Sequence, residues 1–251
     1  MYHYPLLSSP DFGFIRAPGP GFGNLLFPIT RALQAAKIKR EIFVPPTMFN
    51  IKIGPLIRQE KSFRLYNKEI KKRTFSEWMN FLRAYTYRDR VTFYSGEGNF
   101  FHDLKESRLL INDWLLLNTL EKPINNAGKI AVHIRRGDFK KSNNSEFSSQ
   151  IPTQWYLDIV DRLLTKIDTE VILFSDSKVS DKWSIFGSRI KLSQNKSACS
   201  NILSMSTADI LVASRSTFSL WSFFLSKQNT FFPKGLDLSS VISDISNIEY
   251  V

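Results

Sequence analysis

Short apolar runs alternate with amphipathic segments in the second half of the chain. The runs have the length of buried strands, and the segments between them have apolar residues three or four positions apart, as helices do. The expected strands are residues 130–134, 171–174, 190–192, 210–213 and 230–232, and the expected helices are residues 155–164, 197–205 and 218–225. Alternating strands and helices predict a parallel sheet with right-handed crossovers, flanked by helices.

The first half of the chain shows the same two patterns less regularly. A glycine-rich loop, Pro18–Asn24, leads into a helix that is expected over residues 25–36. Asn24 is placed to cap that helix, and Pro28 falls in its first turn, where proline is tolerated. The other elements expected here are strands at residues 12–15 and 42–44 and helices at residues 75–87 and 109–120.

A change of pattern near residue 125 predicts two domains. Pro123, Asn125, Asn126 and Gly128 form a short segment of turn-forming residues between the irregular half and the alternating half. We therefore expect one α/β domain over residues 1–125 and a second over residues 126–251.

A charged loop follows the first strand of the second half. Ile130–Ile134 leads directly into Arg135, Arg136, Gly137 and Asp138. Open α/β sheets bind ligands outside the carboxyl ends of their strands, and two guanidinium groups there suit a phosphate or diphosphate. The Asp138 carboxylate could orient an arginine or act as a base. An ordinary salt bridge between Arg135 and Asp138 that closes a turn explains the same residues equally well.

Polar side chains also follow two other strands of this half. Asp176 comes after the strand at 171–174, and Ser216, Thr217 and Ser219 open the helix that follows the strand at 210–213. Taken singly, Asp176 is a common turn residue, and Ser216 or Thr217 is a common N-cap. Parallel strands end at the same edge of a sheet, however, so hydroxyls, a helix N-terminus, a carboxylate and the two arginines should converge. That conjunction favours nucleotide binding.

Composition sets limits on the class of protein. No apolar run approaches the roughly 18 residues of a membrane span, and the N-terminus lacks the pattern of a signal peptide. The single Cys199 excludes an internal disulfide and fits a reducing compartment. His3, His102 and His133 are far apart in the sequence, so no zinc site is expected. We therefore expect a cytoplasmic protein without a metal ion.

The charge of the chain is unevenly distributed. The formal net charge is +11, from 34 basic and 23 acidic residues. Residues 1–125 hold 19 basic and 11 acidic residues, a net charge of +8, and residues 126–251 hold 15 and 12, a net charge of +3. The excess would attract nucleic acid, an anionic membrane surface or a phosphorylated acceptor, or it could be a solvated face kept for solubility. Nucleic acid is disfavoured because the excess lies outside the half that carries the charged loop.

Several segments together resemble the bacterial α-1,2-fucosyltransferases and, more loosely, the wider group of GDP-fucose-dependent fucosyltransferases. These segments are Gly21–Phe27, Val132–Asp138, Phe174–Asp176 and Ser200–Trp221, and their order and spacing agree with the family from about residue 12 to residue 233. The sequence Val-His-Ile-Arg-Arg-Gly-Asp at 132–138 is the most specific of them. Leu25, Ser177, Arg215 and Leu220 depart from the residues that the family often has.

The resemblance implies a fold and a reaction. The fold would be α/β, with two Rossmann-like domains facing a cleft (GT-B type) and parallel sheets flanked by helices. Residues 126–251 would hold the donor nucleotide, and residues 1–125 would bind the acceptor. The reaction would be an inverting transfer of fucose from GDP-fucose to a sugar hydroxyl in surface-glycan synthesis, with an α-1,2 linkage to a galactoside. It would need neither a metal ion nor a cofactor.

The resemblance also implies roles for individual residues. Arg135 would contact the diphosphate and act in catalysis, His133 and Arg136 would orient the loop, and Asp176 would help to hold the nucleoside. Asp138 is the candidate base, and it could instead brace Arg135 or Arg136. The hydroxyls expected to close on the phosphates belong to Ser216, Thr217 and Ser219. The residues expected to line the cleft from the other domain are Gly21, Gly23 and Asn24.

Other functions fit parts of the same evidence. A transferase of this fold could use another nucleotide sugar, and a glycan-binding or nucleic-acid-binding protein would need no catalysis. The acceptor could be an oligosaccharide linked to a lipid diphosphate at the cytoplasmic face of a membrane, or a soluble glycan. The basic excess of residues 1–125 would suit peripheral contact with an anionic membrane.

Overall fold

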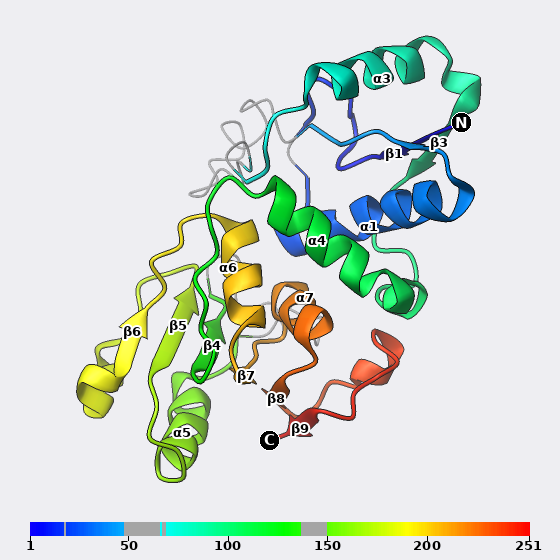
Figure 1. Cartoon of the computed structure of the whole chain (residues 1–251). Coiled ribbons are helices and arrows are strands. Elements are labelled where there is room, and N and C mark those ends of the chain that lie inside the picture. The colour runs from blue at the N-terminus through cyan, green and yellow to red at the C-terminus, as the bar shows by residue number, and fades with distance from the viewer. Residues whose placement is uncertain (18, 48–65, 67–68, 137–149) are drawn as a thin grey trace. The chain divides into compact units, whose positions relative to one another are not determined.

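The chain forms two compact units in the computed structural model (Figure 1). The structure describes residues 1–17, 19–47, 66, 69–136 and 150–251. Unit 1 comprises Met1–Lys122 and Ser197–Cys199, and unit 2 comprises Pro123–Lys196 and Ser200–Val251. The division after Lys122 lies close to the boundary expected after residue 125.

The described part of unit 2 contains a six-stranded parallel sheet in the order β6-β5-β4-β7-β8-β9. Its strands are β4 (Ile130–Ile134), β5 (Val171–Ser175), β6 (Ile190–Leu192), β7 (Ile210–Val212), β8 (Asn229–Phe232) and β9 (Ile248–Tyr250). β5 and then β6 follow on one side of β4, and β7, β8 and β9 follow in turn on its other side. This is the Rossmann order, and the point at which the order of the strands reverses lies between β4 and β7. The predicted parallel α/β sheet is confirmed, and β9 was not predicted.

Helices connect these strands. The helical elements of unit 2 are α5 (Thr153–Leu164), α6 (Ala198–Ser206), α7 (Thr217–Ser226) and the 3-10 segments η4 (Asp181–Arg189) and η5 (Leu238–Ser240). The three helices expected here are confirmed to within two residues at each end. Ser197–Cys199, at the start of α6, belong to unit 1. Glu69 Oε2 accepts the N–H of Cys199 at 2.9 Å, and Glu121 Oε2 accepts the N–H of Ser197 at 2.7 Å.

Strand β4 is buried on both faces. Successive side chains of a strand point to opposite faces, and Ile130, Val132 and Ile134 accordingly join one hydrophobic cluster with Tyr156 and other residues of α5. His133 therefore points to the opposite face, where it meets the start of α7. The strand that was predicted from its apolar residues thus also places the His133 ring against the start of α7.

Unit 1 contains a three-stranded parallel sheet in the order β2-β1-β3 within its described residues. The strands are β1 (Tyr2–Pro5), β2 (Ile42–Phe43) and β3 (Val91–Tyr94), the helices are α1 (Phe22–Lys39), α3 (Phe75–Thr86) and α4 (Arg108–Asn118), and the 3-10 segments are η1 (Arg88–Arg90) and η2 (His102–Ser107). The expected strand at 42–44 and the expected helices at 75–87 and 109–120 are confirmed. None of the described helices in either unit combines the length and apolar character that crossing a bilayer requires.

The strand expected at residues 12–15 is wrong. Gly13 adopts φ +80°, and its N–H donates to Asp11 Oδ1 at 2.8 Å, which makes a tight turn at this point. Phe12 and Phe14 are exposed on that turn. The first strand is instead Tyr2–Pro5, which pairs with both β2 and β3.

The start of α1 also differs from the expectation. The N-cap is Gly21 rather than Asn24, so Asn24 lies in the first turn and Pro28 lies inside the helix. Asn24 does not cap because the helix already begins at Phe22, and its Nδ2 instead donates to Glu97 Oε1 at 2.7 Å. Pro28 has no N–H to donate to the carbonyl four residues earlier, and the helix continues past it to Lys39.

Candidate functional site

The charged residues that follow β4 and β5 form one cluster. Arg135 Nε lies 3.2 Å from Asp176 Oδ2, and Asp176 Oδ1 accepts the backbone N–H of Arg136 at 2.8 Å. Ile134 and Ser175 are paired in the parallel register, so the two loops leave the sheet side by side. The side chains of Arg135 and Asp176 are each 24% exposed, which leaves the pair accessible from one side. Asp176 therefore fixes both the Arg135 guanidinium and the loop that carries it.

The partner of Arg135 is thus not the one considered from the sequence alone. A salt bridge between Arg135 and Asp138 was one interpretation of the loop. Gly137 and Asp138 lie outside the described residues, and the ion pair that the structure describes joins Arg135 to Asp176. The roles predicted for Asp138, as a base or as a brace, stay predictions.

Arg136 is anchored toward the start of α5. Its Nη2 donates to Thr153 Oγ1, and its carbonyl oxygen accepts from Gln150 Nε2 at 3.1 Å. Neither Thr153 nor Gln150 was identified from the sequence, because both follow the loop by more than ten residues. Arg136 is therefore tied to the scaffold by its side chain and by both backbone groups, as a residue that orients the loop would be.

His133 lies beneath this loop in a buried polar contact. Its Nδ1 is 2.5 Å from Ser219 Oγ and 2.7 Å from Ser214 Oγ, and the two hydroxyl oxygens are 3.0 Å apart. The Phe218 ring stacks on the imidazole with the centroids 5.0 Å apart. Burial lowers the pKa of His133 to about 3, and the positive charge of Arg135 acts in the same direction. His133 is therefore neutral near pH 7, and it ties β4 to the start of α7.

The N-terminus of α7 has the features of an anion-binding helix end. Ser216 is the N-cap, and its Oγ accepts the N–H of Phe218 at 3.1 Å. Thr217 begins the helix, and the first turn contains no acidic residue, so no carboxylate of its own offsets the positive end of the helix dipole. Ser219 is fully buried against His133. Its hydroxyl thus supports the imidazole in this structure, whereas it was expected to close on a phosphate.

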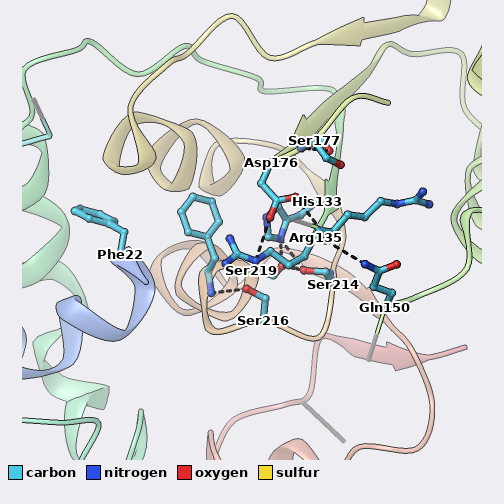
Figure 2. A network of polar contacts seen from close by, with 12 residues as sticks. Phe22, His133, Arg135, Gln150, Asp176, Ser177, Ser214, Ser216 and Ser219 are labelled. Carbon is cyan, nitrogen blue, oxygen red and sulfur yellow. Dashed lines mark hydrogen bonds and ion pairs between the residues drawn. The ribbon is translucent and has the colours of Figure 1, made fainter. Parts of the chain in front are cut away.

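These residues gather at the point where the order of the strands reverses (Figure 2). Arg135 follows β4, Asp176 follows β5, and Ser214 and Ser216 follow β7. In doubly wound sheets the crevice at this reversal is the usual ligand site. The predicted convergence of the strand ends is therefore present within unit 2. What they present to a ligand is a braced guanidinium, a helix N-terminus and hydroxyl groups, which together suit an anionic group.

Comparison with protein families gives a clear result. The family model described as "Glycosyl transferase family 11" matches residues 57–233, which is more than half of the chain. The chain belongs to glycosyl transferase family 11. The matched range contains the Arg135–Asp176 pair and the start of α7. No curated protein sequence matches the chain.

Solved fucosyltransferase structures resemble this family 11 protein at low identity. A NodZ alpha-1,6-fucosyltransferase soaked with GDP-fucose is 14% identical, with a TM-score of 0.42 over 89% of this chain and 92% of that chain. NodZ from Bradyrhizobium is 12% identical, with a TM-score of 0.41 over 88% and 91% of the two chains. A complex of POFUT1 with GDP-fucose is 12% identical, with a TM-score of 0.49 over 92% and 97%. Because these TM-scores lie below 0.5, the assignment depends on the family match.

The glycine loop of this glycosyltransferase lies in unit 1. Gly21 is the N-cap of α1, Gly23 lies in its first turn, and the Asn24 amide is held by Glu97. Glu97 stands between Gly96 and Gly98, which adopt φ +62° and φ +60°, so the carboxylate sits on a tight turn. The prediction that Gly21, Gly23 and Asn24 line a cleft stays a prediction. Glu97 was not identified from the sequence, since nothing in its neighbourhood marks it as the partner of Asn24.

Two further residues near the family 11 site were missed. Ser214 contacts His133 although it stands 81 positions later in the chain. Tyr156 of α5 is buried, and burial raises the pKa of its hydroxyl. The charge of Arg136 lowers this pKa, and the charge of Asp176 raises it. The adjacency of the first and fourth strands in the Rossmann order is the signal that could have identified Ser214. Across the described part of the chain, no group of three or more His, Cys, Asp or Glu side chains is arranged to hold a metal ion.

The buried His133 predicts a specific pH dependence of stability. Its pKa is about 3 in the native state and about 6.5 in an unfolded chain. Between these values the unfolded state binds the additional proton, so the stability is complete above about pH 6.5 and falls as the pH falls, by up to about 1.4 kcal/mol per pH unit. Urea unfolding of the wild type and of His133→Asn, in which the amide replaces Nδ1 as the polar group, isolates this contribution. The stability difference between the two proteins should narrow as the pH falls, and a difference independent of pH would contradict the assignment of a neutral, buried His133.

Proposed function

We propose that this family 11 protein transfers fucose from GDP-fucose to a hydroxyl group of a sugar acceptor. The observation that carries the proposal is the Arg135–Asp176 pair at the strand reversal, beside the N-terminus of α7. The family match supports glycosyl transfer. The motifs around Arg135 and Ser216 resemble those of GDP-fucose-dependent enzymes, and this resemblance supports the choice of donor.

Arg135 acts on the leaving group in this proposal. Negative charge grows on the diphosphate as the bond between fucose and GDP breaks. A guanidinium that is already fixed by Asp176 stabilises this charge without first having to reorganise, which favours the transition state over the ground state. The positive end of the α7 dipole adds to the same effect. Arg135 can thus supply the charge that a metal ion supplies in other transferases.

His133 has a supporting role. Its Nδ1 is engaged by Ser214 and Ser219, and a pKa of about 3 makes it a weak base near neutral pH. Its contacts hold the start of α7 against the strand that carries Arg135. The proton of the acceptor hydroxyl must therefore be taken by another group, and Asp138 is the candidate that the sequence offers.

The proposed transfer inverts the anomeric centre through in-line attack by the acceptor hydroxyl. The proposed product is an α-1,2-linked fucoside of a galactose unit in a surface glycan. The acceptor is an oligosaccharide on a lipid diphosphate or a soluble glycan, and unit 1 carries the excess of positive charge that would suit the first of these.

A donor and acceptor screen tests the proposal. The protein is incubated with GDP-fucose, GDP-mannose or a UDP-sugar over an array of glycans, and the linkage of each product is determined. We expect transfer from GDP-fucose alone and an α-1,2 linkage to galactose. Transfer from a different nucleotide sugar, with none from GDP-fucose, would replace the proposed donor. The absence of transfer from any donor would favour a glycan-binding protein without catalysis.

A further inference from the structure

Helix α3 in unit 1 has large apolar side chains beyond those that it buries. Its N-terminus is fixed by a capping box, in which Thr74 and Glu77 bond each other's backbone N–H groups. Only Phe81 and Ala84 are buried, and they pack in a small cluster that includes Tyr4. The other large apolar side chains of α3 lie outside this buried cluster, although Trp78 and Tyr85 contact the Phe81 ring at its margin.

Four large side chains form an exposed stripe along α3. They are Phe75, Trp78, Leu82 and Tyr85, which are 83%, 40%, 49% and 56% exposed. Their spacing of three, four and three positions places them on one side of the helix. Scattered single exposed apolar residues are common in proteins, but a contiguous stripe usually marks an interaction surface. We refer to these four residues as the α3 stripe.

The segment that contains the α3 stripe carries an excess of basic residues. Residues 71–93 contain six basic residues (Lys71, Lys72, Arg73, Arg83, Arg88 and Arg90) and two acidic residues (Glu77 and Asp89). Their net charge is 6 − 2 = +4, against +8 for all of residues 1–125. Glu77 is already occupied in the capping box. Positive charge and exposed aromatic residues therefore occur together in this part of unit 1.

Two of these arginines pair with exposed rings beside the helix. The Arg88 guanidinium lies 5.9 Å from the centroid of Phe93, and that of Arg90 lies 5.3 Å from the centroid of Tyr87. Both rings are exposed. Rings with an apolar body, next to long cationic side chains, are the residues that settle at the boundary between lipid headgroups and acyl chains.

We propose that the α3 stripe and its arginines dock this protein onto an anionic lipid bilayer. Phe75 and Leu82 enter the interface, Trp78 and Tyr85 lie at the level of the headgroups, and the cations contact anionic lipid. The docking does not depend on the donor chemistry of unit 2. A second copy of the chain would bring the same positive charge against itself, and a neutral glycan would stack on the rings without any need for the cations. An anionic membrane uses both features.

Vesicle flotation tests this surface directly. We expect the wild-type protein to float with vesicles of phosphatidylcholine mixed with phosphatidylglycerol, and not with phosphatidylcholine alone. Added salt should reverse the binding. The double variant Phe75→Ser/Leu82→Ser should bind at least about tenfold more weakly, because two exposed apolar side chains no longer enter the interface. Arg88→Gln and Arg90→Gln should each weaken binding about fivefold.

A matched control distinguishes loss of the α3 stripe from the general effect of removing an exposed apolar side chain. Ile185 in η4 of unit 2 is 70% exposed, so Ile185→Ser removes a similar exposed side chain away from α3 and should leave flotation unchanged. The urea midpoint of each variant checks its fold, and the affinity for GDP checks that unit 2 still works. Failure of the wild-type protein to bind the mixed vesicles, or wild-type binding by the double variant, would overturn the proposal. A solution dimer that the double variant abolishes, without vesicle binding, would assign the stripe to a second copy instead.

Discussion

Replacing Arg135 with alanine should lower the turnover of fucosyl transfer by about 10² to 10³-fold, with little loss of stability. The guanidinium is fixed by Asp176 before the reaction, so its removal takes away stabilisation of the leaving diphosphate without disturbing the core. Initial rates with GDP-fucose and an acceptor, together with urea midpoints, measure the two effects. Arg135→Lys should fall between the wild type and alanine, because lysine keeps the charge but loses the planar fork.

Lys191 offers a matched control for the Arg135 variant. It lies in β6, elsewhere in unit 2, and forms an ion pair with Glu170 at the surface. Lys191→Ala removes a paired cation of the same unit and should leave turnover unchanged. Equal activity in Arg135→Ala and Lys191→Ala would mean that the Arg135 guanidinium has no part in the reaction.

The second large effect is expected from Asp176→Asn. The amide can still accept the N–H of Arg136, but it no longer pairs with the positive charge of Arg135. Without this ion pair the Arg135 guanidinium can move from its position, and we expect kcat to fall by about 10²-fold. Because Arg135 acts mainly in the transition state, kcat should fall more than KM rises. Asp244, which pairs with Lys227 at 2.7 Å in the same unit, provides the control variant Asp244→Asn.

The kinetics of Asp176→Asn and of its double variant with Arg135→Ala distinguish two roles for Asp176. The resemblance to fucosyltransferases implied that Asp176 helps to hold the nucleoside. In that case the affinity for the donor would fall more than kcat, and Arg135→Ala would be additive with Asp176→Asn. If Asp176 positions Arg135, the double variant should be little worse than Arg135→Ala alone. An additive double variant would therefore contradict the positioning role.

Much of unit 2 could be predicted from the sequence because its central strands, β4 and β5, are buried on both faces over most of their length. Val171–Phe174 is apolar throughout, Ile130–Ile134 is apolar except for His133, and the helices between the strands are amphipathic. Ile248–Tyr250 was missed because it has a glutamate at its centre and pairs with only one neighbour. The alternating pattern by itself did not give the order of the strands, since that order follows from the packing of the crossovers.

The pairing within the site depended on that order. Asp138 stands three residues from Arg135 and was the natural candidate partner, whereas Asp176 stands 41 positions away and meets Arg135 because β4 and β5 are neighbours. The contact between His133 and Ser214 similarly requires β4 to lie beside β7. Local sequence thus identified the chemical groups, and the topology determined which of them meet.

Unit 1 was predicted less completely because its signals are local and compete. The apolar run at Phe12–Ile15 resembles a strand, but the bond from the Gly13 N–H to Asp11 makes a turn there. Asn24 is a residue type typical of an N-cap, but α1 begins earlier, at Phe22, with Gly21 as its N-cap. The first error arose because a side-chain hydrogen bond outweighed the strand propensity of the surrounding residues, and the second arose because the helix begins before the residue that is typical of an N-cap.

Calorimetric titration of GDP tests most directly whether the ends of β4, β5 and β7 form a donor site. We expect saturable binding by the wild type and by Lys191→Ala, and binding at least about tenfold weaker by Arg135→Ala, because a charge-assisted contact to the diphosphate is lost. UDP should bind more weakly than GDP to all three proteins. Failure of the wild type to bind GDP, or equal GDP affinity in the wild type and Arg135→Ala, would contradict the proposed donor site.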